Sequence, residues 1–509
     1  MIDVLFSLVD VNERFNRLVF DPVYINNLDL TVKSSINHIP STDTQMFDRV
    51  CEKILPRIYH QVKKLICEPH SMERILFTVD YPQLRSLSLV NFQKETFFQC
   101  LTGSTILRSL LTNQITHLNI EIKDETIAEL CNENKSNIFP FILSLSKQLI
   151  DLTFSEMTYT QRLGISTFNL SLTSCISSTL IKLKIDVNTF DDCLYLLDGR
   201  LECLSILIVK IREISMSLSK IDNTVSSFES LYRKLLKLNH FSLISVLHTI
   251  FYDAQVVPLL QRMTNLEELT LFISVLRSES TYIDGNYFYD EILVHMPRLN
   301  KFTFNIITEI VNANVGIVFP LNDDIQFSFK KRGYHQVGSY SDYNPTMGVA
   351  KCHVYSLPYQ FELFIILNNF FPGGMFNKVR YLTMNDTSPF EHELFKLVSQ
   401  DFPYLENLYI CNFCAQENKQ DSSTLIVFPH LIALKLGRSH INYAEQFLFE
   451  KNTRLPRLRK LTINYKTLEM VTDYFTNDAM RLNCANLQSI DTDGPFVRPK
   501  NFHQYFPLL

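Results

Sequence analysis

Cysteine and histidine residues at short spacings raise the question of a metal or redox site. Cys411-Asn412-Phe413-Cys414 is the one Cys-x-x-Cys motif in the chain. A structural zinc site needs four ligands, and no second pair follows the first. A redox dithiol is expected to open a helix, whereas this motif follows the strand-like residue Ile410. We therefore expect these thiols, and the adjacent pair Cys352-His353, to be structural, and the sequence predicts no metal site.

Motifs that bind phosphate or support catalysis are missing or incomplete. Gly333-Tyr334-His335-Gln336-Val337-Gly338-Ser339 has the glycine spacing of a phosphate loop but lacks its Lys. No Gly-x-Gly-x-x-Gly, Gly-x-Ser-x-Gly or His-Glu-x-x-His motif occurs. Asp191-Asp192 and Glu391-His392-Glu393 resemble helix starts, where negative charge is favourable, and Asp323-Asp324 has no evident nucleophile beside it. The sequence therefore predicts a chain that is not an enzyme and needs no cofactor.

Composition and charge favour a folded chain without general affinity for nucleic acid or membranes. Apolar residues make up 46% of the 509 residues and charged residues 20%, which is typical of globular proteins. The formal net charge is −5, from 48 basic and 53 acidic residues, so no general attraction to nucleic acid or to an anionic membrane is expected. The apolar runs at 138–145 and 361–367 are shorter than the roughly 18 residues of a membrane-spanning helix. We expect neither nucleic acid nor a membrane as a partner.

Cysteine usage and the first residues favour a reducing compartment. The 11 cysteines follow no spaced disulfide framework. Residues 1–14 lack the basic leader, long apolar run and small-residue cleavage site of a secretory signal. Thiols are kept reduced in the cytosol and nucleus, so the expected localisation is cytoplasmic or nuclear.

A short apolar phrase, Leu-x-x-Leu-x-Leu with Phe, Ile, Val or Met as substitutes, recurs along the chain. Copies without a leading Pro include Ile115/Leu118/Ile120, Leu149/Leu152/Phe154, Leu266/Leu269/Leu271 and Val379/Leu382/Met384. Five copies follow an aromatic or aliphatic residue and a Pro, at Tyr81-Pro82, Met296-Pro297, Phe402-Pro403, Phe428-Pro429 and Leu455-Pro456. The alternating end of the phrase predicts a half-buried strand, and Pro is suited to the position just before one.

The segments between the phrases have helical spacing in several places. Residues 443–449, 191–197 and 124–130 each place apolar side chains on one helical face. The copies recur mostly every 21–37 residues, and every 26–29 residues in the C-terminal part. Strand, turn and helix at this period are typical of leucine-rich repeats. We therefore predict an α/β fold, an irregular leucine-rich-repeat solenoid (horseshoe). Irregularity is expected because Asn188 alone, among the clearer copies, occupies the usual asparagine position.

The repeats divide the chain into four predicted parts. Residues 1–24 form a helical N-terminal segment, 25–305 a first repeat array, 306–378 an insertion or diverged repeats with a long loop, and 379–509 a second array. Within 306–378, residues 325–329 and 353–357 are predicted as strands, 333–348 as a polar loop, and 361–371 as a helix that ends at Pro372-Gly373-Gly374.

Side chains that alternate with the strand leucines point away from the core and form the predicted partner-binding concave face. They mix both charges with hydroxyl, amide and aromatic groups, which suits a protein substrate better than a phosphate backbone. The set includes His117, Asn119, Glu121, Asp151, Lys182, Lys184, Glu268, Lys301, Tyr381, Asn407, Tyr409, Lys435 and Lys460.

The N-terminal residues 3–19 are helical in pattern, with Leu5, Leu8, Val11, Phe15 and Leu18 on one stripe. One interpretation is a helix that caps the first repeat. The segment also resembles the second half of an F-box, in which a Leu-rich helix leads into Val-x-x-Arg-Phe-x-x-Leu. Val11, Arg14, Phe15 and Leu18 match that pattern. An F-box followed by leucine-rich repeats is the order found in a large family, of which this chain resembles a divergent animal branch.

The resemblance to that branch extends over nearly the whole chain. Shared segments are Phe371-Pro372-Gly373-Gly374, Pro389-Phe390-Glu391-His392-Glu393, Tyr443-Ala444-Glu445-Gln446-Phe447-Leu448 and Arg481-Leu482-Asn483-Cys484-Ala485. One departure is that the family's box begins with a Leu-Pro-x-Glu helix, which does not precede Val11 here. Either Met1 is not the true start or the adaptor contact has been lost.

The resemblance implies a function in protein recognition. The family's box docks onto the Skp-type adaptor of a cullin ubiquitin ligase, so Leu5, Leu8, Val11, Arg14, Phe15 and Leu18 would contact the adaptor. The repeats would then bind the protein substrate. The alternative is a leucine-rich-repeat scaffold or tethering protein with no ligase link, in which the first 20 residues serve only as a cap.

Overall fold

The computed structural model describes residues 7–31, 47–123, 138–156, 176–216, 237–278, 280–311, 319–344, 348–417, 424–492, 498–499 and 501–509. The chain divides into two compact units, Met1–Ile317 and Val318–Leu509, which we call unit 1 and unit 2. The predicted division into four parts was based on the repeats and not on compact units, so it stays a prediction. The predicted helix at 124–130 lies outside the described residues.

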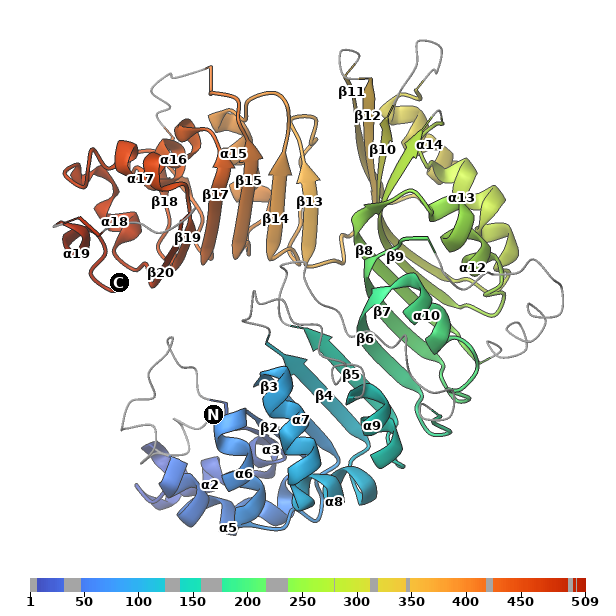
Figure 1. Cartoon of the computed structure of the whole chain (residues 1–509), viewed down its shortest axis with the longest axis vertical. Coiled ribbons are helices and arrows are strands. Elements are labelled where there is room, and N and C mark those ends of the chain that lie inside the picture. The colour runs from blue at the N-terminus through green and yellow to red at the C-terminus, as the bar shows by residue number, and fades with distance from the viewer. Residues whose placement is uncertain are drawn as a thin grey trace. The chain divides into compact units, whose positions relative to one another are not determined.

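Unit 1 contains a large parallel sheet whose strands follow one another in chain order (Figure 1). Adjacent strands pair in register, so that Leu118 of one strand lies opposite Leu152 of the next. The strands described in this unit are β1 (Asn27–Asp29), β2 (Lys64–Cys67), β3 (Ser86–Phe92), β4 (His117–Ile122), β5 (Asp151–Glu156), β6 (Lys182–Thr189), β7 (Ile206–Glu213), β8 (His240–Thr249), β9 (Glu268–Ser278) and β10 (Lys301–Val311).

Helices connect these strands and cover the face that carries the leucines. Buried residues such as Phe97, Leu107 and Phe190 project from them toward the sheet core. The helical segments are α2 (Glu13–Val19), α3 (Pro22–Ile25), the π-helix η1 (Val50–Ile54), α5 (Leu55–Ile58), η2 (Tyr59–Gln61), α6 (Pro69–Thr78), α7 (Lys94–Gly103), α8 (Thr105–Asn113), α9 (Ile138–Leu145), α10 (Phe190–Leu196), the π-helix η4 (Tyr252–Val256), α12 (Val257–Gln261), α13 (Gly285–Glu291) and η5 (Leu293–His295).

A tight turn leads into the strands that follow a Pro. The backbone N–H of Leu84 donates to the carbonyl of Tyr81 (3.3 Å), and Leu405 donates to Phe402 in the same way (3.1 Å). Pro thus occupies the second position of a four-residue turn, where its fixed φ is favourable and its missing N–H costs nothing. The first Leu of the phrase is buried at the turn, so this local sequence sets where each strand begins.

Unit 2 contains a six-stranded parallel sheet and an antiparallel pair of strands (Figure 1). The six strands are β13 (Leu363–Leu367), β14 (Tyr381–Asn385), β15 (Asn407–Asn412), β17 (Ala433–Ser439), β19 (Lys460–Thr462) and β20 (Ser489–Asp491), and the antiparallel pair is β11 (Val337–Asn344) with β12 (Val349–Ser356). The other elements are β16 (Ile426–Val427), β18 (Thr453–Arg454), α14 (Asn322–Lys331), α15 (His392–Asp401), α16 (Ile441–Leu448), α17 (Tyr465–Val471), η6 (Asp478–Met480), α18 (Arg481–Cys484) and α19 (Phe502–Tyr505).

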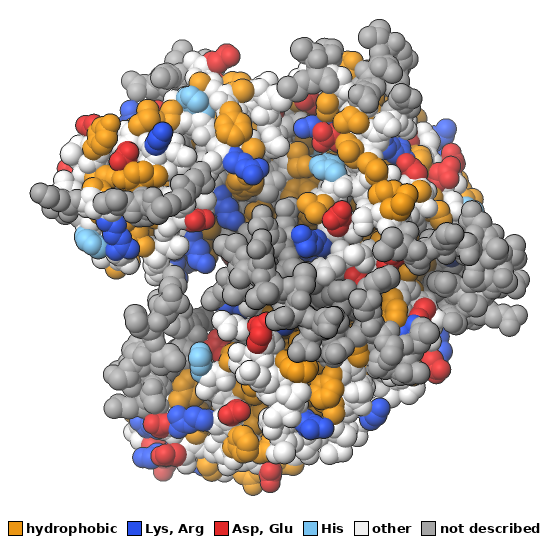
Figure 2. Space-filling view, viewed as in Figure 1, with side chains coloured by type: hydrophobic (Ala, Val, Ile, Leu, Met, Phe, Trp, Pro, Cys, Tyr) orange, Lys and Arg blue, Asp and Glu red, His pale blue; other side chains and the backbone are white. Residues whose placement is uncertain are grey.

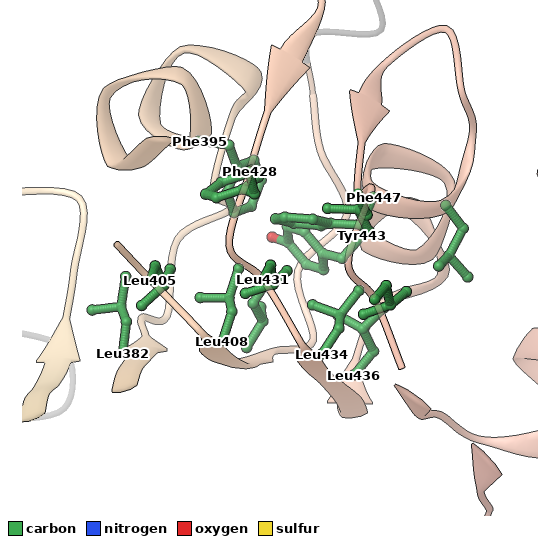
Figure 3. Close-up of a cluster of buried hydrophobic side chains, with 14 of the residues drawn as sticks. Leu382, Phe395, Leu405, Leu408, Phe428, Leu431, Leu434, Leu436, Tyr443 and Phe447 are labelled. Atoms are coloured by element: carbon green, nitrogen blue, oxygen red, sulfur yellow. The ribbon is translucent and has the colours of Figure 1, made fainter. Parts of the chain in front are cut away.

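The core of unit 2 is built from equivalent positions of successive strands. Figure 3 shows Leu382, Leu408 and Leu434 side by side, and the register confirms that they lie opposite one another. Tyr443 and Phe447 of α16 pack on the same core, and both are fully buried. The predicted helix at 443–449 is therefore confirmed, as is the one at 191–197, which corresponds to α10.

The leucine-rich-repeat solenoid predicted from the spacing is wrong, although the α/β class is confirmed. What the structure contains is a large, mostly parallel sheet without a uniform repeat. Strand length varies from three residues in β1 to 11 in β9. The connections vary as well, from the two helices α7 and α8 between β3 and β4 to the single short helix α10 between β6 and β7. The phrase encodes a turn and a strand, but it leaves the return segment unspecified.

Within 306–378 the structure corrects three assignments and confirms one. Residues 325–329, predicted as a strand, lie in helix α14, whose first turn carries Asp323 and Asp324. Part of the predicted loop 333–348 is strand β11, and the predicted helix 361–371 contains strand β13 instead. The predicted strand at 353–357 corresponds to β12.

Aromatic side chains fill the beginning of unit 2. Phe364, Phe376 and Phe402 contact one another, with the Phe376 and Phe402 rings stacked at 4.8 Å between centroids. His353 is 3% exposed in this cluster, and a 2.8 Å hydrogen bond joins its Nδ1 to the Tyr340 hydroxyl. Burial lowers the pKa of His353 to about 3, so the ring is neutral over most of the pH range.

The neutral His353 should make the protein less stable in mild acid. Its ordinary pKa of about 6.5 applies to the unfolded chain, which takes up a proton that the folded state rejects. The free energy of unfolding should therefore fall as pH decreases from 6.5 toward 3, by up to about 1.4 kcal/mol per unit from this group. Urea titrations at several pH values in this range give the free energy of unfolding as a function of pH. This free energy should change less steeply with pH in the double variant Tyr340→Phe/His353→Leu. The exposed-site control His70→Gln should keep the original slope, and equal slopes in all three proteins would contradict the assignment.

Gly338 of β11 lies against the ring of Tyr355, its cross-strand partner, and a Cβ there would overlap the ring. Gly338→Ala should therefore displace a buried aromatic side chain and lower the free energy of unfolding by about 1–3 kcal/mol. Gly103→Ala is the matched control, because it lies in helix α7 with no atom within 4 Å of the added methyl group. That variant should be neutral or more stable by about 0.5–1 kcal/mol, as measured by chemical denaturation. A destabilisation of the same size in both variants would argue against the Tyr355 contact.

Candidate functional site

The acidic residues noted at 191–192 and 391–393 lie at the N-terminal ends of helices. Asp192 is fully buried, and its Oδ2 accepts hydrogen bonds of 2.9 Å from both the backbone N–H and the hydroxyl of Thr189. The Thr189 hydroxyl in turn accepts from the Asp192 N–H (3.2 Å), which completes a capping box for α10. Glu391 and Glu393 lie at the start of α15. These carboxylates therefore stabilise helix N-termini, as predicted for Asp191-Asp192 and for 391–393.

The Cys-x-x-Cys motif lies at the end of strand β15. The Cys414 thiol donates a 3.0 Å hydrogen bond to the carbonyl of Thr387, and its backbone N–H donates to Asn412 Oδ1 (2.8 Å). Among the described residues, no group of three or more His, Cys, Asp and Glu side chains is arranged to hold a metal ion. The geometry around Cys414 is that of a turn after a strand.

The glycines of the incomplete phosphate loop have structural uses. Gly333 has a φ of 93° just after α14, a conformation that favours glycine at a helix end. Gly338 allows the Tyr355 ring to approach the backbone. Neither glycine is part of an anion-binding turn at the start of a helix.

A shallow depression lined by Cys51, Arg74 and Phe77 lies beside the π-helix η1. Burial raises the pKa of the Cys51 thiol, so it is a poor nucleophile at neutral pH. Arg74 is paired with Asp48. The arrangement offers little for catalysis.

In unit 1 the predicted partner-binding residues form in-register rows on the sheet. His117, Asp151 and Lys182 lie opposite one another, and the row continues through Ile206 and His240 to Glu268 and Lys301. Asn119 and Lys184 lie in the next row, separated by Thr153. The structure thus brings together side chains that are far apart in the sequence.

The charges in the first row of unit 1 pair with one another. Lys182 Nζ donates to Asp151 Oδ2 at 2.9 Å, and Lys301 Nζ donates to Glu268 Oε2 at the same distance. The Lys301 hydrogen bond lowers the pKa of Glu268, opposed by partial burial. His240 Nδ1 lies 3.3 Å from the same Glu268 oxygen. In the next rows, Asn119 donates to Glu121 (3.1 Å). This surface therefore satisfies much of its own charge and hydrogen bonding.

In unit 2 the predicted residues form a different surface. Tyr381, Asn407 and Lys460 belong to one in-register row, while Tyr409 and Lys435 are opposite one another in the next. Without a bulge, Gly437 would lie opposite Cys411. A bulge in β17 places Arg438 there instead. We call Tyr381, Tyr409, Lys435, Arg438 and Lys460 the cationic sheet face.

Burial tunes the groups of the cationic sheet face. It raises the pKa of Tyr381 and Tyr409, so both hydroxyls are protonated at neutral pH. Burial lowers the pKa of Lys435, which Asp491 opposes and the neighbouring Lys460 reinforces. Asp491 lies in the same row as Lys435, with Thr462 between them. The ammonium group is thus partly desolvated, with a carboxylate two strands away.

The N-terminal segment is not one continuous helix, contrary to the prediction for 3–19. Asp10 has a φ of 65°, and a new helix, α2, begins at Glu13 with Asn12 as its cap. The cap forms because Asn12 Oδ1 accepts the backbone N–H of Phe15 (2.9 Å). Asp21 caps α3 in the same way through Val23. Leu5 lies outside the described residues.

The segment is anchored to unit 1 by a set of residues other than the predicted stripe. Val9, Val19 and Ile25 are buried. Arg57 forms a 3.0 Å ion pair with Asp10, and its guanidinium lies 4.3 Å from the centroid of the Phe20 ring. The backbone break at Asp10 is what changes the buried face.

The predicted stripe faces away from the fold. Val11 is 58% exposed, Phe15 38% and Leu18 52%, while Leu8 is half-buried and Arg14 is exposed. Val23 and Tyr24 of the adjoining α3 are also exposed. We call Val11, Phe15, Leu18, Val23 and Tyr24 the N-terminal apolar surface. A cap over the first strand would bury this stripe, and here it remains accessible.

Comparison with known proteins gives no family assignment. No family model matches the chain, and a search of curated proteins finds no match either. None of the described helices has the length and apolar character needed to cross a bilayer. Acidic, basic and apolar side chains are intermingled over the face shown in Figure 2.

Sequence reasoning missed several residues of these surfaces. His240 occupies the same position in its phrase as Glu268, so the repeat itself contained the signal. Val23 and Tyr24 follow the F-box-like pattern without belonging to it. Arg438 is displaced by a bulge, for which the sequence offers only the neighbouring Gly437 as a signal.

Proposed function

We propose that this chain is a protein-recognition subunit of a cullin-type ubiquitin ligase. In this proposal the N-terminal apolar surface docks onto a Skp-type adaptor, and the outward sheet faces bind the protein substrate. The chain supplies binding surfaces and no catalysis or cofactor of its own. It acts in the cytoplasm or nucleus, in keeping with the absence of disulfides among the cysteines that the structure describes.

The observation that carries the proposal is the exposure of the N-terminal apolar surface. Five apolar side chains between residues 11 and 24 are at least 38% exposed on a segment that is itself held by buried neighbours. Exposed apolar side chains gathered on one segment are typical of a protein-binding surface. Val11, Phe15 and Leu18 are also positions that match the F-box pattern, which is why a Skp-type adaptor is the partner we propose.

Scaffolding without a ligase link is the second candidate. It is favoured by the burial of Val9, Val19 and Ile25, through which the same segment also covers the edge of the sheet near β1. In that case the exposed stripe would contact some other protein, or none. The two candidates differ in whether adaptor and cullin accompany the chain.

Replacing exposed apolar residues at the N-terminus should abolish adaptor binding. Val11→Glu/Leu18→Glu adds two charges to side chains that contribute little to the folded core, so stability should stay within about 0.5 kcal/mol. Binding of the purified chain to a Skp-type adaptor, measured by calorimetry and by co-purification with the cullin, should weaken more than about tenfold because two apolar contacts are lost.

The matched control for that experiment is Phe327→Glu/Met470→Glu. These residues are 64% and 63% exposed on helices α14 and α17 of unit 2. The control protein should bind the adaptor as the unmodified chain does. Failure of the unmodified chain to bind an adaptor would defeat the ligase proposal and leave the scaffold.

A buried residue of the same helix should separate anchoring from docking. Val19→Ala removes two methyl groups from a side chain that is 4% exposed. The free energy of unfolding should fall by about 1–3 kcal/mol, while adaptor affinity at a temperature where the protein stays folded should change less than about twofold. A large loss of affinity with intact folding would mean that the docking surface includes the buried face.

A further inference from the structure

We propose that the cationic sheet face of unit 2 binds an acidic, extended segment of a protein partner. This inference rests on the proposed recognition function, and it specifies the chemistry of the substrate rather than the link to the ligase. The occupant to which we commit is a peptide with several Asp or Glu residues.

Charge balance is the first argument. In the first row of unit 1, Lys182 and Lys301 are each paired with a carboxylate at 2.9 Å. On the cationic sheet face, Lys435, Arg438 and Lys460 lie on the adjacent strands β17 and β19. Among the outward positions described on the six-stranded sheet, Asp491 is the acidic group, so the face has an excess of positive charge. Unit 1 thus neutralises its row internally, whereas unit 2 leaves cations available to an acidic ligand.

The donors are arranged on a rigid surface. Tyr409 and Lys435 are directly opposite one another on paired strands, about 5 Å apart at the backbone. Burial raises the pKa of Tyr409, Cys411 adds to the increase and Arg438 opposes it, so both Cys411 and Arg438 lie beside the phenol. Ammonium, guanidinium and phenol groups all donate hydrogen bonds to carboxylates, and those to charged acceptors are the stronger kind.

The spacing of the cations suits an extended chain. Lys435 and Arg438 are three positions apart on one strand, which corresponds to about 10 Å, and Lys460 lies one strand away. Alternate side chains of an extended peptide repeat at about 7 Å on one side. An acidic residue at every second position can therefore reach these cations from a single backbone.

The alternative of single-stranded nucleic acid is less well matched. Sequence-independent binding of this kind relies on aromatic rings exposed for stacking with bases. Tyr381 and Tyr409 are half-buried, and burial dominates the shift of their pKa. The two rings therefore offer little exposed area for stacking with bases.

The test uses the full-length chain and a fluorescein-labelled peptide of alternating Glu and Ala, with fluorescence anisotropy as the readout. The peptide should bind, more weakly as salt increases, and the matching Gln/Ala peptide should not. Lys435→Gln/Lys460→Gln should weaken binding about tenfold or more. The matched control Lys330→Gln/Lys331→Gln removes the same charge from exposed positions of helix α14 in unit 2 and should change affinity less than about twofold.

Three results would overturn the proposal. They are no binding of the Glu/Ala peptide, an equal loss in both double variants, and tighter binding of a labelled oligouridine RNA than of the peptide. Adaptor binding is measured on the same variants to separate the two proposals. If Lys435→Gln/Lys460→Gln loses the peptide and keeps the adaptor, both proposals stand. If the unmodified chain binds the peptide but no adaptor, only the ligase link fails.

Discussion

In-register pairing of neighbouring parallel strands is the constraint on which the rest of the structure depends. Each strand places its phrase leucines opposite those of the next strand, as Leu382, Leu408 and Leu434 illustrate. Because side chains alternate along a strand, the same register aligns the intervening residues in rows on the other face. A slip of one residue would bury Lys182 or Tyr409 and expose a leucine. The core therefore fixes the arrangement of the polar surface at no additional cost.

The rows show how one register can produce two kinds of surface. Along unit 1, neighbouring positions of one row are occupied by Asp151 and Lys182, then by Glu268 and Lys301, so adjacent strands neutralise each other. In unit 2 the corresponding positions are occupied by Tyr381, Asn407, Ala433 and Lys460, without a carboxylate among them. The two units therefore differ in the side chains of these rows and not in the pairing of their strands. A common architecture thus allows the two units to differ in the charge that their sheets carry.

The elements that local sequence determines were predictable, and those that depend on tertiary packing were not. The turn before Leu405 and the strand after it follow from Pro403 and the alternation of leucines. Residues 325–329 alternate like a strand but form a helix, because Asp323 and Asp324 favour a helix start. The predicted helix 361–371 instead contains the strand Leu363–Leu367. Its neighbours Phe364 and Ile365 are both buried, a pattern that periodicity cannot distinguish from a helix. Each outward residue could be predicted from its own strand. The ion pairs between them could not, because each pair joins two strands whose residues are about 30 positions apart in the chain.

The chain-order arrangement of the strands also bears on how the protein folds. Asp151 and Lys182, which face each other on adjacent strands, are 31 residues apart in the chain, and Glu268 and Lys301 are 33 apart. Parallel sheets usually require slow, distant pairings, yet each strand from β2 to β10 pairs with the strand that precedes it in the chain. Loop closure over such a distance has a similar entropic penalty at every step, since that penalty grows only with the logarithm of loop length. Assembly can then advance from strand to strand during synthesis, each new strand finding a template that the ribosome has already released.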